Sequence, residues 1–227
     1  MNPYAVLAAA AAEWHRLADR VTGPTRERLA ALLTVVRHRE AGEPARRGAA
    51  EEAAGLLRRA LPDEFGTAQE ARLATGVTTG TGSATDTGTD PSYLGFRADD
   101  LAVLLLDGHR MVGPVLGPVR DRLLAEPALD PATVLRDGGD PYARDLIRLP
   151  GPGGLARLPR FQFSEGCLPW LVVLEVNGLL DAARDPWGAA DWWLAGNAWL
   201  GTAPAALLGT GQERRLADTA RLLMEDV

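Results

Sequence analysis

The sequence predicts a mainly α-helical protein, with an N-terminal three-helix bundle, a flexible linker, and a C-terminal helical domain preceded by a short β-hairpin. Three observations predict this class. Apolar residues recur at helical spacing over most of the chain, Asp-Pro steps mark helix starts, and one tract with few apolar residues separates two parts. With 227 residues, the chain is long enough for one sizeable domain or two small ones.

Residues 1–75 form the first predicted domain, to which the sequence assigns no role. Three helices are expected between residues 3 and 62, each with apolar side chains on one face. Thr22 can cap the second helix, and Pro24 fits its first turn. Three such helices with short connections predict a small bundle. The apolar positions are Leu7, Ala11, Trp14, Ala18 and Val21; Leu29, Leu32, Leu33 and Val36; and Ala50, Ala54, Leu57 and Leu61.

The tract at residues 76–92, GVTTGTGSATDTGTDPS, is rich in Gly, Thr and Ser. Its small apolar area cannot repay the entropy cost of ordering. We therefore predict a flexible linker and a domain boundary here. Gly80 and Gly82 lie in the tract, but no Gly-Lys-Ser/Thr follows, so a phosphate-binding loop is not indicated.

Residues 93–163 are predicted to form a helical segment followed by a β-hairpin. The helical pattern is expected in two pieces, because Gly113, Pro114, Gly117 and Pro118 interrupt it. Two apolar arms, near 146–149 and 157–163, then flank Gly151, Gly153 and Gly154, which predicts the hairpin.

Three Asp-Pro steps predict helix starts, because Asp accepts hydrogen bonds from the free N–H groups of a helix and Pro fits its first position. They are Asp130-Pro131, Asp140-Pro141 and Asp185-Pro186. In the last predicted domain, residues 164–227, a further helix is expected over 168–184, although its Val-rich start is also compatible with a strand. The final helix is expected over about Gln212–Glu225.

The composition excludes several classes of function. The net charge of −6 does not favour nonspecific nucleic-acid binding, although residues 1–60 carry ten Arg against seven acidic residues. A lone Cys167 excludes an internal disulfide, and the three histidines have no ligand partners at metal-site spacing. No apolar run reaches the roughly 18–20 residues of a membrane span, and the run at 5–12 lacks a preceding basic segment. We expect a cytoplasmic protein with no membrane contact.

The stretch DPWGAADWWLAGNAWLGTAPAALLG, residues 185–209, holds four of the six tryptophans. On a helix at 100° per residue, Trp187, Ala190 and Leu194 share one face and Trp193 borders it. Trp192 points almost the other way. We expect core packing for the first face, and for Trp192 either packing on another element or contact with a partner. Gly196 and Asn197 are expected to end this helix, and Thr202 to cap a short one after it.

The pattern that follows resembles the toxin-binding domain of the Xre–MbcA–ParS antitoxin family. The matching positions are Trp192, Asn197, Leu200, Pro204, Leu207 and Leu208, with Gly201 one position from its usual place. The upstream LPRFQF, residues 158–163, is also similar to a hairpin end found before this domain. The resemblance covers about residues 140–227.

This resemblance implies a helical module that dimerises, binds a RES-domain toxin that destroys NAD, and blocks access to the toxin's active site. It implies no cofactor and no catalysis. A stoichiometric inhibitor needs a rigid apolar patch with a few anchors, often Trp, Arg or Leu. The predicted partner-binding residues are Trp192, Trp199, Leu200, Pro204, Leu208, Arg214, Arg215 and Arg221.

Two other functions remain open from the sequence. The segment 111–148 is compatible with a degenerate helix-turn-helix with the hairpin as its wing, which would serve a DNA-binding autoregulator. Its six acidic residues from Asp121 to Asp145 weaken that prediction, because a recognition helix needs cationic or amide side chains. A structural or adaptor protein that reuses the antitoxin-like domain is the third possibility.

No enzyme is predicted, because the chain has no Ser-His-Asp arrangement with a supporting motif and no paired metal ligands. Asp99 and Asp100 are better explained as a pair at a helix N-terminus, and His109 as a structural residue.

Overall fold

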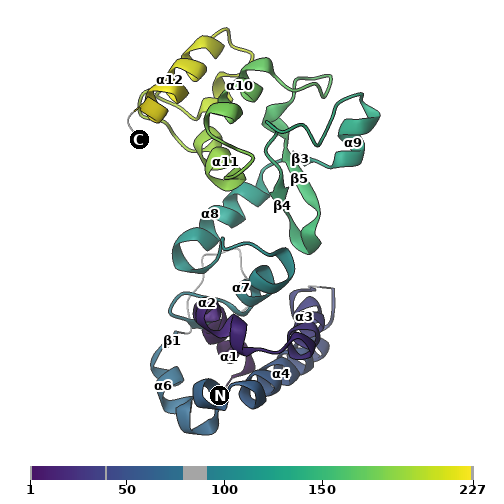
Figure 1. The fold of residues 1–227 in the computed structure, drawn as a ribbon, viewed down its shortest axis with the longest axis vertical. Helices are drawn as coiled ribbons and strands as arrows, with labels where there is room; N and C mark the ends of the chain where they lie inside the picture. Colours follow the sequence, from purple (N-terminus) through teal and green to yellow (C-terminus); the bar gives the residue numbers. More distant parts are fainter. Residues whose placement is uncertain (1, 39, 79–90, 226–227) are drawn as a thin grey trace. The chain divides into compact units, whose positions relative to one another are not determined.

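The computed structural model describes residues 2–38, 40–78 and 91–225, and in these ranges the chain is mainly helical, as predicted (Figure 1). The chain divides into two compact units, Met1–Pro118 and Val119–Val227. The division falls within the helix α8 (Gly113–Ala125).

The helix α1 (Pro3–Ala12) is the central element of the N-terminal unit. Every residue from Pro3 to Ala11 is buried, because α4 (Glu43–Ala60), α7 (Ala98–Ala102) and the strand β2 (Ser92–Tyr93) all pack against it. The sequence predicted an amphipathic helix that continues to Val21. Instead the helix breaks at Glu13 and resumes as the short α2 (Trp14–Leu17).

The second and third predicted helices are present as α3 (Gly23–Arg37) and α4, which lie side by side (Figure 1). Their apolar stripes face the core, including Leu29, Leu33 and Leu57. Two short helices, α5 (Pro62–Phe65) and α6 (Glu70–Thr75), complete the segment before the Gly/Thr/Ser-rich tract.

The two ends of that tract pair with each other. The strand β1 (Val77–Thr78) lies antiparallel to β2, with Val77 opposite Tyr93. Residues 79–90 of the predicted linker lie outside the described residues. The N-terminal unit continues beyond the tract, because Ala98, Leu101 and Ala102 of α7 belong to the same core as α1, α3 and α4. The predicted boundary at 76–92 therefore differs from the division within α8.

Two acidic residues with buried side chains, Asp100 and Asp107, form hydrogen bonds and an ion pair in the last part of this unit. The Asp100 carboxylate accepts hydrogen bonds from the backbone N–H of Arg97 and of Gly113, which fixes the start of α7. A π-helical turn, Val103–Asp107, follows α7, and Asp107 pairs with Arg37 of α3 at 2.6 Å. The predicted role of Asp100 at a helix N-terminus is confirmed.

The C-terminal unit combines helices with a three-stranded antiparallel sheet. The strands are β3 (Ala128–Leu129), β4 (Leu149–Pro150) and β5 (Ala156–Pro159), in the order β3-β5-β4. The predicted hairpin is β4 and β5, with Leu149 opposite Arg157. The helices after α8 are α9 (Pro131–Arg136), α10 (Leu171–Leu179), α11 (Pro186–Leu194) and α12 (Glu213–Glu225). α10 and α12 pack side by side (Figure 1).

Two of the three Asp-Pro predictions are confirmed. Asp130 caps α9 and Asp185 caps α11, each through a side-chain oxygen that accepts a backbone N–H three residues later. The prediction at Asp140 is wrong, since residues 140–146 form turns. The Asp140 carboxylate accepts the N–H of Tyr142, two residues later, which closes a turn in place of a helix start.

Candidate partner-binding surface

Trp193 is part of the core of the C-terminal unit. Its side chain is fully buried, and its indole N–H donates to the Asn177 side-chain oxygen at 2.8 Å. The Phe161 ring lies against it, with 5.4 Å between ring centroids. The helical projection placed Trp193 only at the border of the buried face, so its complete burial depends on the packing of α10 and the hairpin end.

Asn177 and Gln162 extend this contact into a buried polar network. The Asn177 amide N–H donates to the Asp145 carbonyl at 2.8 Å and to the Gln162 side-chain oxygen at 3.3 Å. Gln162 in turn accepts from the backbone N–H of Ile147 at 2.7 Å and donates to its carbonyl at 3.0 Å. The network joins α10, α11, the hairpin end and the segment before β4, and it gives Trp193 a structural role.

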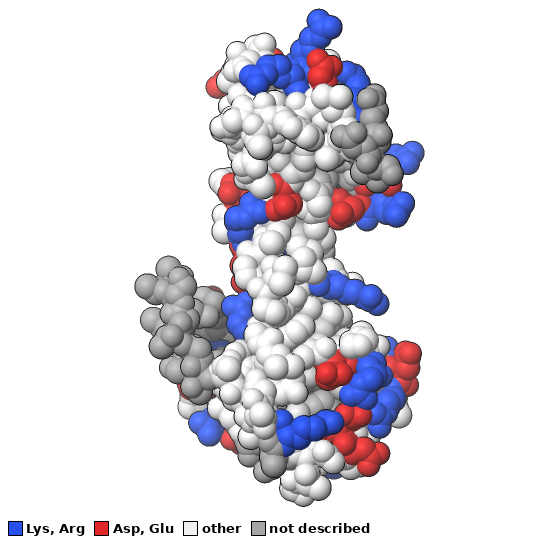
Figure 2. Space-filling model, turned by 90° about the vertical axis from the view of Figure 1, so that its left-hand side faces the viewer, with Lys and Arg blue, Asp and Glu red and all other residues white. Residues whose placement is uncertain are grey.

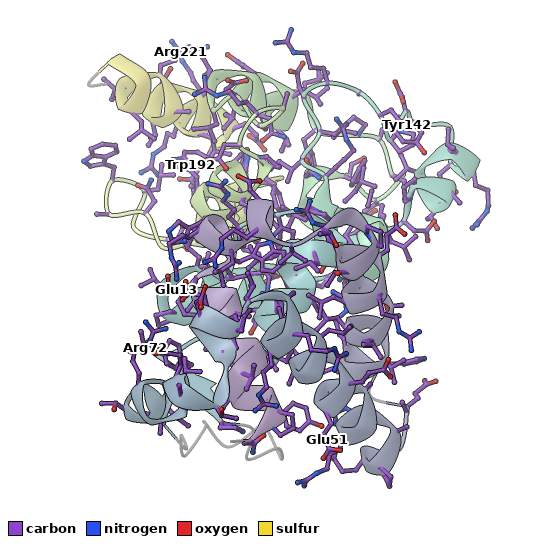
Figure 3. The ribbon with its side chains drawn as sticks, turned by 60° about the horizontal axis from the view of Figure 1, so that its bottom comes forward. Glu13, Glu51, Arg72, Tyr142, Trp192 and Arg221 are labelled. Carbon is purple, nitrogen blue, oxygen red and sulfur yellow. The ribbon has the colours of Figure 1, made fainter. Side chains whose placement is uncertain are left out.

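Trp187 and Trp192 differ in exposure. Trp187 is buried, as predicted. Trp192, on α11, is half-buried (Figure 3). It meets Trp193 edge to face, with 5.1 Å between centroids and an interplanar angle of 88°. Beside it, Asp191 pairs with Arg122 of α8. Much of the Trp192 ring is thus used within the unit, so Trp192 can present only part of its surface to a partner.

Trp199 is the tryptophan of this block that faces solvent. It is 61% exposed on the loop after α11. The Asn197 side-chain oxygen accepts the backbone N–H of Trp199 at 2.9 Å and of Leu200 at 3.2 Å. The Asn197 N–H donates to the Thr202 carbonyl at 3.1 Å, and the Gly201 N–H donates to the Asn197 carbonyl at 2.8 Å. Four hydrogen bonds therefore hold this six-residue loop, residues 197–202, in one shape.

The residues that flank Trp199 anchor the loop to the unit. Leu200 and Pro204 are buried, Leu208 is half-buried, and a 3₁₀-helix, Pro204–Leu207, packs against both α11 and α12. Three predicted partner-binding residues, Leu200, Pro204 and Leu208, thus lie wholly or partly inside the fold. Sequence spacing could not separate them from Trp199, because an irregular loop has no repeating face.

The three predicted arginines lie on the outer side of α12. Arg221 lies on α12 (Figure 3). It pairs with Asp218 at 3.0 Å and with Glu175 of α10, and Arg214 is close to Asp218, at 3.9 Å. Arg215 donates to the Gln212 side chain at 2.5 Å. All three are exposed, and all three have partners within the unit.

The segment proposed as a degenerate helix-turn-helix lacks a second long helix. α9 has six residues, and residues 137–148 form turns and extended chain. Three arginines of this segment and of the hairpin after it bind the protein's own backbone: Arg148 donates to the Ala143 carbonyl, Arg157 to the Leu124 carbonyl and Arg160 to the Phe163 carbonyl. On the face shown in Figure 2, acidic and basic side chains of this unit are intermixed.

Other kinds of site find little support in the described ranges. These residues contain no group of three or more His, Cys, Asp or Glu placed to hold a metal, and no helix long and apolar enough to cross a membrane. Cavities of about 250 Å³ lie beside the hairpin and beside the end of α10. They are smaller than the roughly 300–1,000 Å³ typical of small-molecule sites.

Comparison of the chain with models of known protein families, with curated proteins and with solved structures finds no match. The antitoxin resemblance therefore rests on the residues of this chain alone.

Proposed function

We propose that this chain is an antitoxin-like protein that binds and neutralises a RES-type toxin, which degrades NAD, by protein–protein contact. The observation that carries the proposal is Trp199, a solvent-exposed indole on a hydrogen-bonded loop. The loop lies within the segment, residues 192–208, whose pattern resembles the toxin-binding domain. Exposed tryptophans on rigid supports are frequent anchors of protein interfaces.

A stoichiometric inhibitor needs a preorganised surface, because binding energy is not then lost to ordering the loop. The C-terminal unit offers such a surface, since the Trp193–Asn177–Gln162 network and the Asn197 turn fix α11 and the loop after it.

The test is co-purification of this chain with a RES-domain protein encoded beside it, followed by an NAD-consumption assay. We expect a stable complex and loss of NAD turnover at a stoichiometric ratio. The mass of the free chain and of the complex, from light scattering, checks the homodimer that the resemblance implies. A RES-domain protein that consumes NAD unhindered at excess of this chain would exclude the proposal.

Direct operator binding is the weaker alternative, because arginines of the hairpin region bind backbone carbonyls and no recognition helix follows α9 within residues 137–148. We expect weak binding of the chain to its own promoter at 150 mM salt. A sequence-selective complex whose affinity falls steeply with salt would favour the autoregulator.

A further inference from the structure

The Trp199 loop lies in a stretch of 21 residues, Trp192–Gln212, without a charged side chain. At the chain's average of 24% charged residues, such a stretch would carry about five. Part of it is surface, since Gly196, Ala198, Trp199 and Gly201 are exposed. The loop therefore presents one indole among small, uncharged residues.

The loop's shape is fixed before any partner arrives. Asn197 takes part in all four hydrogen bonds that close it, through its side-chain oxygen, its N–H and its carbonyl, and buried Leu200 and Pro204 anchor the chain to the unit. Gly201 has φ +76°, a left-handed conformation that glycine adopts without strain, and this lets the chain turn back toward Thr202. An indole on such a support loses little conformational freedom on binding.

The charged face of α12 is a poorer anchor. Arg221 already pairs with Asp218 and Glu175, and Arg214 and Arg215 also have neighbours within the unit. A partner that engaged these arginines would compete with internal contacts, and its binding would weaken as salt screens the charges.

We infer that the Trp199 loop is the central anchor of the partner interface, and that the partner protein receives it in an uncharged, apolar pocket of indole size. Asn197 acts as the positioning residue that holds Trp199 outward. The inference rests on the proposed function for the identity of the partner. The Trp199 loop is then the surface that binds, and the partner's pocket is apolar and uncharged.

The first experiment measures the affinity of the full chain for the RES-domain partner at 50 and 500 mM NaCl. We expect Trp199→Ala to weaken binding by about 30-fold or more, in the range of an interface hot spot. Leu222→Ala is the matched control, since Leu222 is also exposed and apolar but lies on α12. Leu222→Ala should change the affinity by less than about 3-fold, and raising the NaCl concentration from 50 to 500 mM should also change it by less than about 3-fold.

Positioning by Asn197 has its own readout. In the free chain, Asn197→Ala should raise the backbone mobility of Trp199, measured by ¹⁵N relaxation, and weaken partner binding. Asn197→Ser should restore part of both, because a serine hydroxyl accepts the same N–H groups more weakly. Unchanged mobility in Asn197→Ala would overturn the positioning role.

An experiment without the partner protein tests the Trp199 anchor separately from the proposed toxin binding. β-Cyclodextrin offers a neutral, apolar cavity, and we expect it to shift the NMR indole N–H signal of Trp199 and leave that of buried Trp193 unchanged. Absence of that shift, a complex unaffected by Trp199→Ala, or an affinity that falls tenfold or more with salt would overturn the inference while the toxin complex stands. A failed complex with a shifted Trp199 signal would overturn the proposed function and support an indole anchor for another protein.

Discussion

The Glu64 carboxylate in the N-terminal unit accepts hydrogen bonds from three arginines. It accepts from Arg16 at 2.7 and 2.9 Å, from Arg20 at 2.9 Å and from Arg72 at 3.4 Å, and the Glu64 side chain is 12% exposed. Hydrogen bonds, first of all from Arg16, lower the pKa of Glu64 to about 2 from its ordinary 4.5. Because the pKa is lower in the folded chain, this stabilisation is fully present above pH 4.5 and is lost as the pH falls toward 2.

Glu64→Gln should therefore lower the free energy of unfolding at pH 7 by about 1–2 kcal/mol, once the exposure of the three arginines to solvent is allowed for. The free energies of unfolding of Glu64→Gln and of the wild type should approach each other as the pH falls from 5 to 3. Urea denaturation of both proteins across this pH range measures the two values. Glu13→Gln is the control, since Glu13 contacts the same Arg16 but is 41% exposed, and its cost should stay under about 0.5 kcal/mol. A difference in the free energy of unfolding that stays constant with pH would contradict stabilisation by the ionised Glu64 carboxylate.

Cys167 sits beside Asp137, and the hydrogen bond of its thiol to that carboxylate is the main cause that raises the pKa of the thiol. Because the thiolate is the reactive form, Cys167 should react slowly with iodoacetamide at pH 8. Asp137→Asn should speed the reaction several-fold, whereas Asp140→Asn, at a carboxylate engaged with Tyr142, should not. Equal alkylation rates in all three proteins, followed by mass spectrometry, would rule out the role of Asp137.

At the scale of elements, the Asn177 network joins α10 and α11 to the hairpin end. Asn177→Leu removes the acceptor of the Trp193 indole N–H and one donor to Gln162, both in the buried core. Buried polar groups without partners are costly, so the free energy of unfolding should fall by about 2–4 kcal/mol. Urea denaturation gives that value, and near-UV circular dichroism reports the environment of Trp193.

A double-mutant cycle sharpens this prediction. Gln162→Leu removes one of the side chains that bond Asn177, so the two substitutions together should cost less than the sum of the single effects. Additive costs would show that the two amides stabilise the unit independently.

The same elements show how far the sequence predicts local structure. Asp130 and Asp185 cap helices as expected, because their carboxylates reach a backbone N–H within their own segment. Asp140 does not begin a helix. A few residues later, the N–H of Ile147 binds the side chain of Gln162, fifteen positions further along the chain. That contact is tertiary, so a pattern within the segment could not reveal it.

The tryptophans also show that the sequence predicts burial on a regular helix but not in an irregular loop. Helical spacing predicted the burial of Trp187, since α11 is regular there. It could not predict that Trp199 would face solvent while Leu200 lies buried, because the Asn197 turn sets their directions. The candidate site was thus predictable as a segment, whereas its division into anchor and scaffold required the structure.

At the scale of the whole molecule, the low apolar content of residues 76–92 predicts a domain boundary there. The boundary between the two compact units lies later in the chain, after Pro118, because residues of α7 belong to the N-terminal core. Leu101 and Ala102 pack with α1, and only a nonlocal contact pattern reveals this. The cores are distinct within the described residues: Leu33 belongs to that of the N-terminal unit, and Leu146 packs with Val134, Leu158 and Phe163 of the C-terminal unit.

Separate cores predict two unfolding transitions in calorimetry. Leu33→Ala and Leu146→Ala should each cost about 2–5 kcal/mol, because each removes a fully buried side chain and leaves a cavity. Each variant should lower the Tm of one transition and leave the other within about 2 °C, since distant substitutions that share no neighbours act independently. α8, which contains the division, is the element through which the units could unfold together. If both variants shift one common transition equally, the two cores unfold as a single cooperative unit.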